Sequence, residues 1–80
     1  MDLLQEALDL ARQRRSLPPP SRRRSLRQRA GLSQPIMAKA IGTTAASVSR
    51  WESGERTPRG RLLRAYSELL TKLADEVAQR

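Results

Sequence analysis

The sequence contains no cysteine, no histidine and no phenylalanine, and its only aromatic residues are one tryptophan and one tyrosine. The absence of cysteine excludes disulfides and thiolate nucleophiles. The absence of histidine removes the commonest general base and the commonest transition-metal ligand. A chain of 80 residues also has room for only a small core, since a domain near this size buries about 60% of its extended-chain surface. We therefore expect no enzyme activity, no metal, no cofactor and no small-molecule ligand.

Long apolar runs are missing as well, because charged residues interrupt the sequence every few positions. We accordingly expect neither a signal peptide nor a membrane span, and we predict a cytoplasmic protein without a membrane partner. Strand-like alternation and internal repeats are absent too. The apolar residues recur instead at the spacing of amphipathic helices, which predicts an all-α fold.

Acidic residues are scarce in the middle of the chain. Residues 12–64 hold fourteen of the sixteen lysines and arginines but only two of the eight acids, so this segment carries a formal charge of +12. The segments on either side contain most of the acids. Positive charge concentrated in one segment is typical of a protein that binds a polyanion.

Proline and glycine divide the chain into helical segments. Residues 2–14 form an amphipathic pattern with Asp2 as N-cap, residues 17–20 contain three prolines, and a second helix is expected over residues 21–30. A final helix is expected to start at the Thr57-Pro58 pair and to extend for more than four turns, with a break into two helices near Thr71 as the alternative. We divide the chain into an N-terminal amphipathic helix (1–16), a proline-rich linker (17–20) and a main domain that ends in a C-terminal helix (21–80).

The segment from residue 31 to residue 58 predicts a helix, a tight turn and a second helix. Ser33 can cap the first helix and Gly42 can end it, while Thr44 can cap the second helix and Gly54 can end that one. In the second helix the apolar residues recur at helical spacing, whereas the polar residues lie off the apolar stripe.

These residues resemble the phage-repressor or Cro-type domains of the lambda-repressor-like, Xre-like helix-turn-helix family. The resemblance covers roughly residues 21–70 and depends on Gly31, Leu32, Ser33, Gln34, Ala38, Ile41, Gly42, Val48, Ser49, Trp51, Glu52 and Gly54. It implies five helices, the first of them added to the family's fold, and a buried ion pair between Arg27 and Glu52. Two residues depart from the family pattern. Arg23 replaces an apolar residue, which predicts a looser helix start, and Ile36 replaces a polar one, which predicts an exposed isoleucine.

The resemblance also implies which residues touch DNA. Arg50 is the leading candidate for a base contact, because its planar fork fits O6 and N7 of guanine. The other candidate base contacts are Thr44, Ala45, Ala46 and Ser47. The candidate backbone contacts are Arg22, Gln34, Lys39, Thr43, Ser49, Arg56 and Arg59. Cations without an acid partner in sequence, Arg23, Arg24 and Arg61 among them, are also expected to face phosphates.

The predicted function is that of a sequence-specific regulator of transcription that binds double-stranded DNA and acts as a repressor. A homodimer is expected through the C-terminal helix, the N-terminal helix or both. The alternative is a monomer in which the N-terminal helix covers the apolar stripe of the C-terminal helix. The C-terminal stripe consists of Tyr66, Leu69, Leu70, Leu73 and Val77. One alternative is an antitoxin or adaptor that uses the same fold to bind a protein. A second alternative, RNA binding, is less favoured because a helix cannot easily enter the deep groove of A-form RNA.

Overall fold

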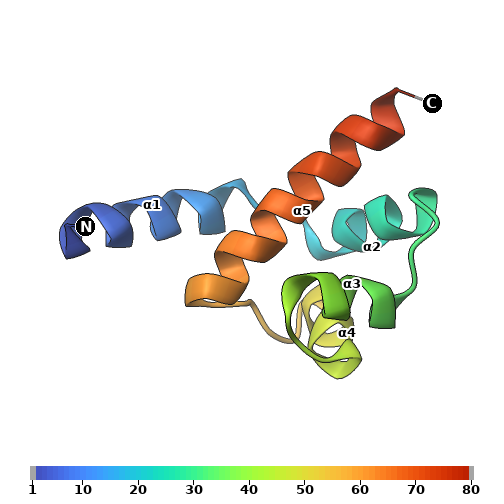
Figure 1. Ribbon diagram of the computed structural model, residues 1–80, viewed down its shortest axis with the longest axis horizontal. Coiled ribbons are helices and arrows are strands. Elements are labelled where there is room, and N and C mark those ends of the chain that lie inside the picture. The colour runs from blue at the N-terminus through green and yellow to red at the C-terminus, as the bar shows by residue number, and fades with distance from the viewer. Residues whose placement is uncertain (1, 80) are drawn as a thin grey trace.

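The computed structural model describes residues 2–79, and within that range it contains five helices and no strand. Figure 1 shows them in chain order: α1 (Leu3–Ser16), α2 (Pro20–Arg29), α3 (Gln34–Ile41), α4 (Ala45–Ser53) and α5 (Gly60–Ala78). The all-α prediction is therefore confirmed.

Three helices begin where a side chain caps them. Asp2 accepts a hydrogen bond from Leu4 N at 3.0 Å, Ser33 from Ile36 N at 3.3 Å and Thr44 from Ser47 N at 3.1 Å. Each of these bonds satisfies a backbone amide that has no partner within the helix. The starts of α1, α3 and α4 agree with the predicted caps because a cap depends only on neighbouring residues.

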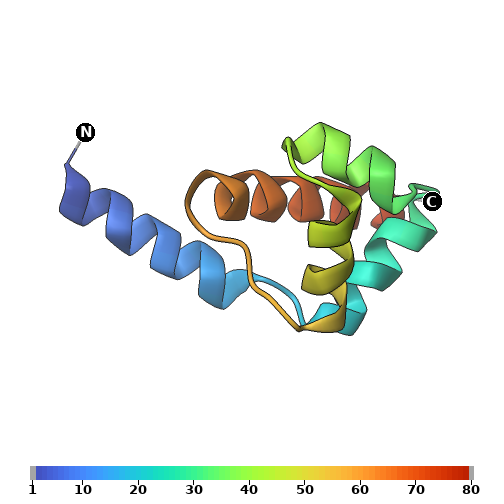
Figure 2. The same ribbon diagram turned by 90° about the horizontal axis from the view of Figure 1, so that it is seen from below.

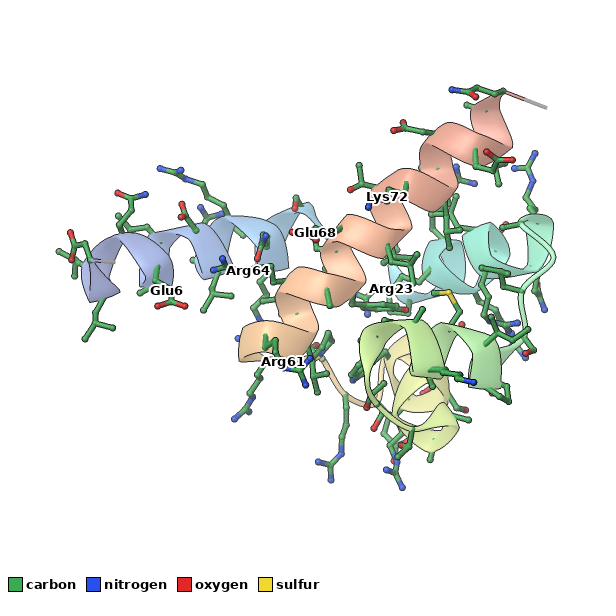
Figure 3. All side chains as sticks on the ribbon, viewed as in Figure 1. Glu6, Arg23, Arg61, Arg64, Glu68 and Lys72 are labelled. Atoms are coloured by element: carbon green, nitrogen blue, oxygen red, sulfur yellow. The ribbon has the colours of Figure 1, made fainter. Side chains whose placement is uncertain are left out.

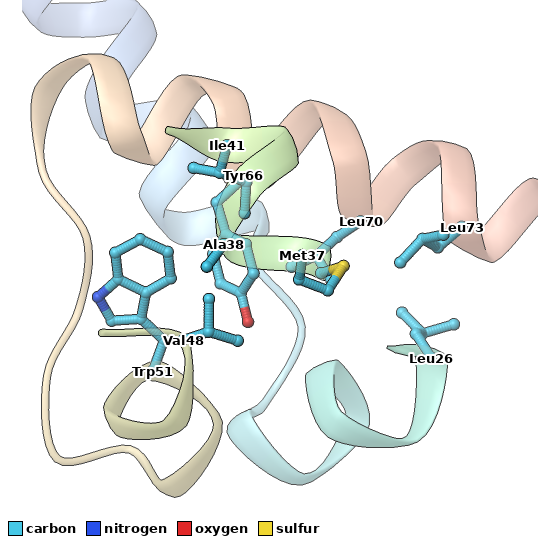
Figure 4. Packing of buried hydrophobic residues seen from close by; sticks show 9 residues of the cluster. All are labelled: Leu26, Met37, Ala38, Ile41, Val48, Trp51, Tyr66, Leu70 and Leu73. Atoms are coloured by element: carbon cyan, nitrogen blue, oxygen red, sulfur yellow. The ribbon is translucent and has the colours of Figure 1, made fainter. Parts of the chain in front are cut away.

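The core lies where α2, α3 and α4 pack against α5 (Figure 4). Tyr66, Met37 and Val48 are its most deeply buried large side chains. The ring centroids of Trp51 and Tyr66 are 4.7 Å apart, so the tryptophan is a core residue and not a free stacking platform. The remaining members of the buried cluster are Leu26, Ala38, Ile41, Leu70 and Leu73.

This packing corrects the expected dimer surface on the C-terminal helix. Tyr66, Leu70 and Leu73 of α5 are buried in the core and cannot form an exposed apolar stripe. Leu69 is partly buried against the same core. The prediction was wrong because three short helices need this face of α5 to bury their own apolar residues.

The first helix extends away from the rest of the molecule, and its N-terminal end projects beyond the other helices in both views (Figures 1 and 2). It contacts α5, yet none of its residues is buried. The exposed fractions of Leu3, Leu4 and Leu8 are 80%, 73% and 51%. These three leucines of α1 therefore face solvent, while Leu10 is half-buried.

The start of α5 differs from the prediction. The helix begins at Gly60, two residues after Pro58, and its N-cap residue Arg59 makes no capping hydrogen bond through its side chain. Gly60 has a φ of +54°, in the left-handed region, so a right-handed helix cannot run from Pro58 through this residue. Pro58 is buried in the preceding loop. At the other end, α5 continues unbroken past Thr71 to Ala78.

Candidate nucleic-acid interface

The turn between α3 and α4 fixes the angle at which α4 leaves the domain. Gly42 has a φ of +90°, and the amides of Gly42 and Thr43 both donate to the Ala38 carbonyl, at 2.8 and 2.9 Å. Thr44 then caps α4. A residue with a side chain is strained at this φ, which explains the glycine. The result is a tight turn that presents the first turn of α4 at the surface.

The two faces of α4 differ sharply. Val48, Trp51 and Glu52 are buried, whereas Ala46, Ser49 and Arg50 are exposed. Of the other candidate contacts, Thr44 is exposed, and Thr43, Ala45 and Ser47 are half-buried. The predicted base and backbone contacts of this region therefore border one outward surface, and its members have short side chains apart from Arg50.

Arg50 is the longest side chain of that outward surface. Its guanidinium forms no hydrogen bond or ion pair with any residue between positions 2 and 79, and its backbone carbonyl accepts bonds from Arg56 N and Ser53 Oγ. All its side-chain donors are therefore available to an external acceptor. A guanidinium can donate two parallel hydrogen bonds to a guanine edge or to a phosphate.

The buried Arg27 and Glu52 form a two-pronged ion pair between α2 and α4. Arg27 Nε donates to Glu52 Oε2 at 2.6 Å and Nη2 donates to Oε1 at 3.0 Å. Arg27 Nη1 also donates to the Leu32 carbonyl at 2.8 Å. The hydrogen bond from Arg27 to Glu52 raises the pKa of the guanidinium despite its burial. This arrangement ties the buried side of α4 to α2 and fixes which side of α4 faces outward.

Gln34, predicted as a backbone contact, lies beside the same ion pair. Its Nε2 donates to Glu52 Oε1 at 3.2 Å, and the residue is half-buried at the start of α3. One donor of the Gln34 amide is therefore used to hold the Glu52 carboxylate.

Four predicted backbone contacts are exposed cations, and two of them, Arg56 and Arg59, line one hollow together with Ser47 of α4. The four cations come from three different elements, and their side chains have no ion-pair partner within residues 2–79. Charges spread in this way suit successive phosphates of a nucleic-acid backbone. These residues are Arg22 of α2, Lys39 of α3, and Arg56 and Arg59 of the loop before α5.

Arg23 does not belong to this group, although the sequence suggested a phosphate contact. It is buried, its Nε donates to the Pro18 carbonyl at 2.7 Å, and its Nη1 donates to the Trp51 carbonyl at 3.0 Å. Figure 3 shows Arg23 inside the molecule near α5. The expected looseness at the start of α2 is thus replaced by a clamp between the linker and α4. The burial of Arg23 could have been predicted from its position, because Arg23 lies one helical turn before Leu26 and Arg27 and so shares their side of α2.

Within residues 2–79 no cluster of three or more carboxylates could hold a metal ion, and none of the five helices could span a membrane. Ile36 is 55% exposed, as its departure from the family pattern predicted.

One comparison with known proteins gives a match. A family model described as a helix-turn-helix domain matches residues 24–79, which is more than half of the chain. No curated protein and no solved structure gives a significant match. The matched segment begins within α2 and excludes α1.

Proposed function

Since the chain belongs to the helix-turn-helix domain family, we propose that it is a sequence-specific regulator of transcription that binds double-stranded DNA and acts as a repressor. The observation that carries this proposal is the outward surface of α4, where Arg50 is exposed and its side chain forms no bond to any residue between positions 2 and 79. Repression follows if the bound protein occupies a promoter or operator that polymerase needs.

In this proposal α4 enters the major groove. Arg50 contacts a guanine edge, while the small side chains of Ala45 and Ala46 let the helix approach the groove floor and pack on thymine methyl groups. Thr44 and Ser47 border the bases at the start of the helix. With so few long side chains, DNA shape and bridging water contribute to recognition alongside direct contacts.

The surrounding polar groups contact the DNA backbone. Exposed Arg22, Lys39, Arg56 and Arg59 neutralise phosphates, and Thr43, Ser49 and the remaining capacity of Gln34 supply hydrogen bonds. This role requires no catalysis, cofactor or small-molecule ligand, and the lack of histidine and cysteine agrees with it.

Selection of bound sites from a random pool of duplexes tests the proposal. We expect one enriched motif. Binding to a selected duplex should fall with salt, with a log–log slope of roughly 0.9 per neutralised phosphate, and should exceed binding to a scrambled duplex throughout. Equal affinity for selected and scrambled duplexes at every salt concentration would refute sequence-specific regulation.

A second candidate function is binding to a protein, as an antitoxin or adaptor. The exposed Ile36 and the exposed leucines of α1 favour it, because large apolar side chains in contact with solvent often mark protein interfaces. This function predicts a partner that remains bound after nuclease treatment and no enriched DNA motif.

A further inference from the structure

A hollow of about 680 Å³ lies between α1, α4 and the loop that precedes α5. Three arginines from two separate segments line it: Arg14 from α1, and Arg56 and Arg59 from the loop. Ser47 of α4 lines it as well. The hollow therefore adjoins the outward surface of α4.

The charges around this hollow are unbalanced. Arg14, Arg56 and Arg59 are all exposed, and their side chains form no ion pair with another residue of the described chain. Glu55 supplies the one carboxylate among the lining residues. Guanidinium groups that border one hollow with a single carboxylate repel each other, and an anion bound in the hollow relieves that repulsion.

Contacts within the protein hold α1, the helix that carries Arg14, against the rest of the molecule. Leu17, directly after α1, packs against the core, and Arg23 holds the Pro18 carbonyl. Figure 3 shows Glu6 and Arg64 facing each other between α1 and α5, with 3.9 Å between their nearest charged atoms. The C-terminal end of α1 is thus attached to the domain by contacts within the protein.

We propose that Arg14, Arg56 and Arg59 together bind one phosphate group of the DNA backbone, on the strand beside the groove that α4 enters. This inference rests on the proposed function and extends its binding surface to α1. Since α1 lies outside the segment that matches the family model, Arg14 is a contribution of this chain's own N-terminal helix.

The test compares Arg14→Gln with Arg15→Gln. Arg15 is the adjacent exposed arginine of α1, and it does not line the hollow. For a selected duplex at about 0.1 M salt, we expect Arg14→Gln to weaken binding by about fivefold to tenfold and to lower the salt slope by about 0.9. Its base preferences should not change. Arg15→Gln should change affinity by less than about twofold, and both variants should keep the wild-type melting temperature.

Neutral methylphosphonate groups, placed at one backbone position at a time, identify the phosphate. We expect one backbone position where the neutral group weakens the binding of the wild-type protein. At that position the neutral group should have little further effect on the binding of Arg14→Gln or Arg56→Gln. Equal affinities for the Arg14 and Arg15 variants, or no shared position, would overturn the phosphate site while leaving the proposed function intact. Failure of the wild-type protein to bind any duplex would overturn both.

Discussion

The ion pair between Arg27 of α2 and Glu52 of α4 controls which side of α4 faces outward. The exposed fractions of the two side chains are only 9% and 3%, so water screens neither charge. The pair itself need not add net stability, because burying two charges costs about as much as their attraction returns. Removing one partner, however, leaves the other charge buried and unpaired.

We therefore predict that Glu52→Ala lowers the free energy of unfolding by about 3 to 5 kcal/mol, measured by urea denaturation. The double variant Arg27→Met/Glu52→Leu replaces both charges with apolar groups and should lose much less stability than the single variant. A loss below about 1 kcal/mol for Glu52→Ala would contradict the interpretation of the pair as buried.

Tyr66 makes stability depend on pH at the alkaline end. Burial, with a smaller contribution from nearby Glu52, raises its pKa from 10.0 to about 12. The unfolded chain ionises this tyrosine first, so the stabilisation is complete below pH 10 and is lost as the pH rises towards 12. The loss reaches about 3 kcal/mol, at 1.36 kcal/mol per pKa unit.

The variant Tyr66→Phe supplies the control for this prediction. Within the described residues the Tyr66 hydroxyl is buried without a hydrogen-bond partner. Removing it should leave stability at pH 7 unchanged or slightly higher, and it should abolish this part of the alkaline loss. Parallel pH curves for the two proteins, measured by urea denaturation from pH 8 to 12, would contradict it.

Arg50 and Arg56 are expected to differ in the kind of contact they make. Arg50 lies on the exposed face of α4, and Arg56 lies in the loop beyond it. Arg50→Ala should relax the preference at one base pair, while Arg56→Ala should weaken all duplexes about equally. Selection from the same random pool measures both profiles. A base-preference profile for Arg50→Ala identical to that of wild type would show that Arg50 contacts only the backbone.

At the scale of the helices, a predicted helix end was correct where the residues that determine it are close together in sequence. The caps at Ser33 and Thr44 act within four residues, and α3 and α4 begin where these caps predicted. The two helices end before the left-handed glycines Gly42 and Gly54, which also act locally. Thr57 and Pro58 resemble a cap just as closely, yet Pro58 is buried in the loop and the left-handed Gly60 delays the start of α5. That outcome depends on tertiary packing, which local sequence patterns do not report.

The same limit applies to charged residues of the helices. An arginine on a predicted helix can reach solvent, an acid or a backbone carbonyl, and only the fold decides among them. Arg27 resembled its family counterpart and formed the expected pair, but Arg23 donates to one carbonyl in the adjacent linker and to another in α4. The exposed positions on α4 followed from helical spacing, whereas the arginine cluster around Arg14 depended on where α1 packs.

Arg23 of α2 connects the linker and α4, so its loss should destabilise the packing of all three segments. Arg23→Ala removes a donor from the buried Trp51 carbonyl and from the half-buried Pro18, and we predict that the free energy of unfolding falls by about 2 to 3 kcal/mol. The adjacent exposed Arg22 provides a matched control, since Arg22→Ala should change stability by less than about 0.5 kcal/mol. Equal losses for the two variants in urea denaturation would mean that the clamp contributes nothing.

At the scale of the whole molecule, the exposed leucines of α1 raise the question of oligomeric state. Leu3, Leu4 and Leu8 face solvent, and α5 cannot cover them because its own apolar face is used in the core. One α4 with mostly short side chains also specifies few base pairs, while two copies roughly 34 Å apart would contact a palindrome in successive major grooves. Both considerations favour a symmetric homodimer.

Charge indicates how two copies would pair. The acids of α1 and its N-cap, Asp2, Glu6 and Asp9, come first, and the arginines that the proposed phosphate site does not use, Arg12 and Arg15, come last. An antiparallel pair of α1 helices would place the acidic end of each copy beside the basic end of the other, with the leucines between them. The dimer that we propose therefore forms through α1, in place of the C-terminal stripe that the sequence suggested.

Sedimentation velocity at micromolar concentration tests this arrangement. We expect a dimer for the wild-type chain and a monomer for Leu4→Glu and Leu8→Glu, because a buried carboxylate at the interface would have no partner. Ile36→Glu introduces the same charge at an exposed apolar residue away from α1 and should remain dimeric. A wild-type monomer that also binds its selected duplex one-to-one would refute the dimer, since a single recognition helix would then suffice for the site.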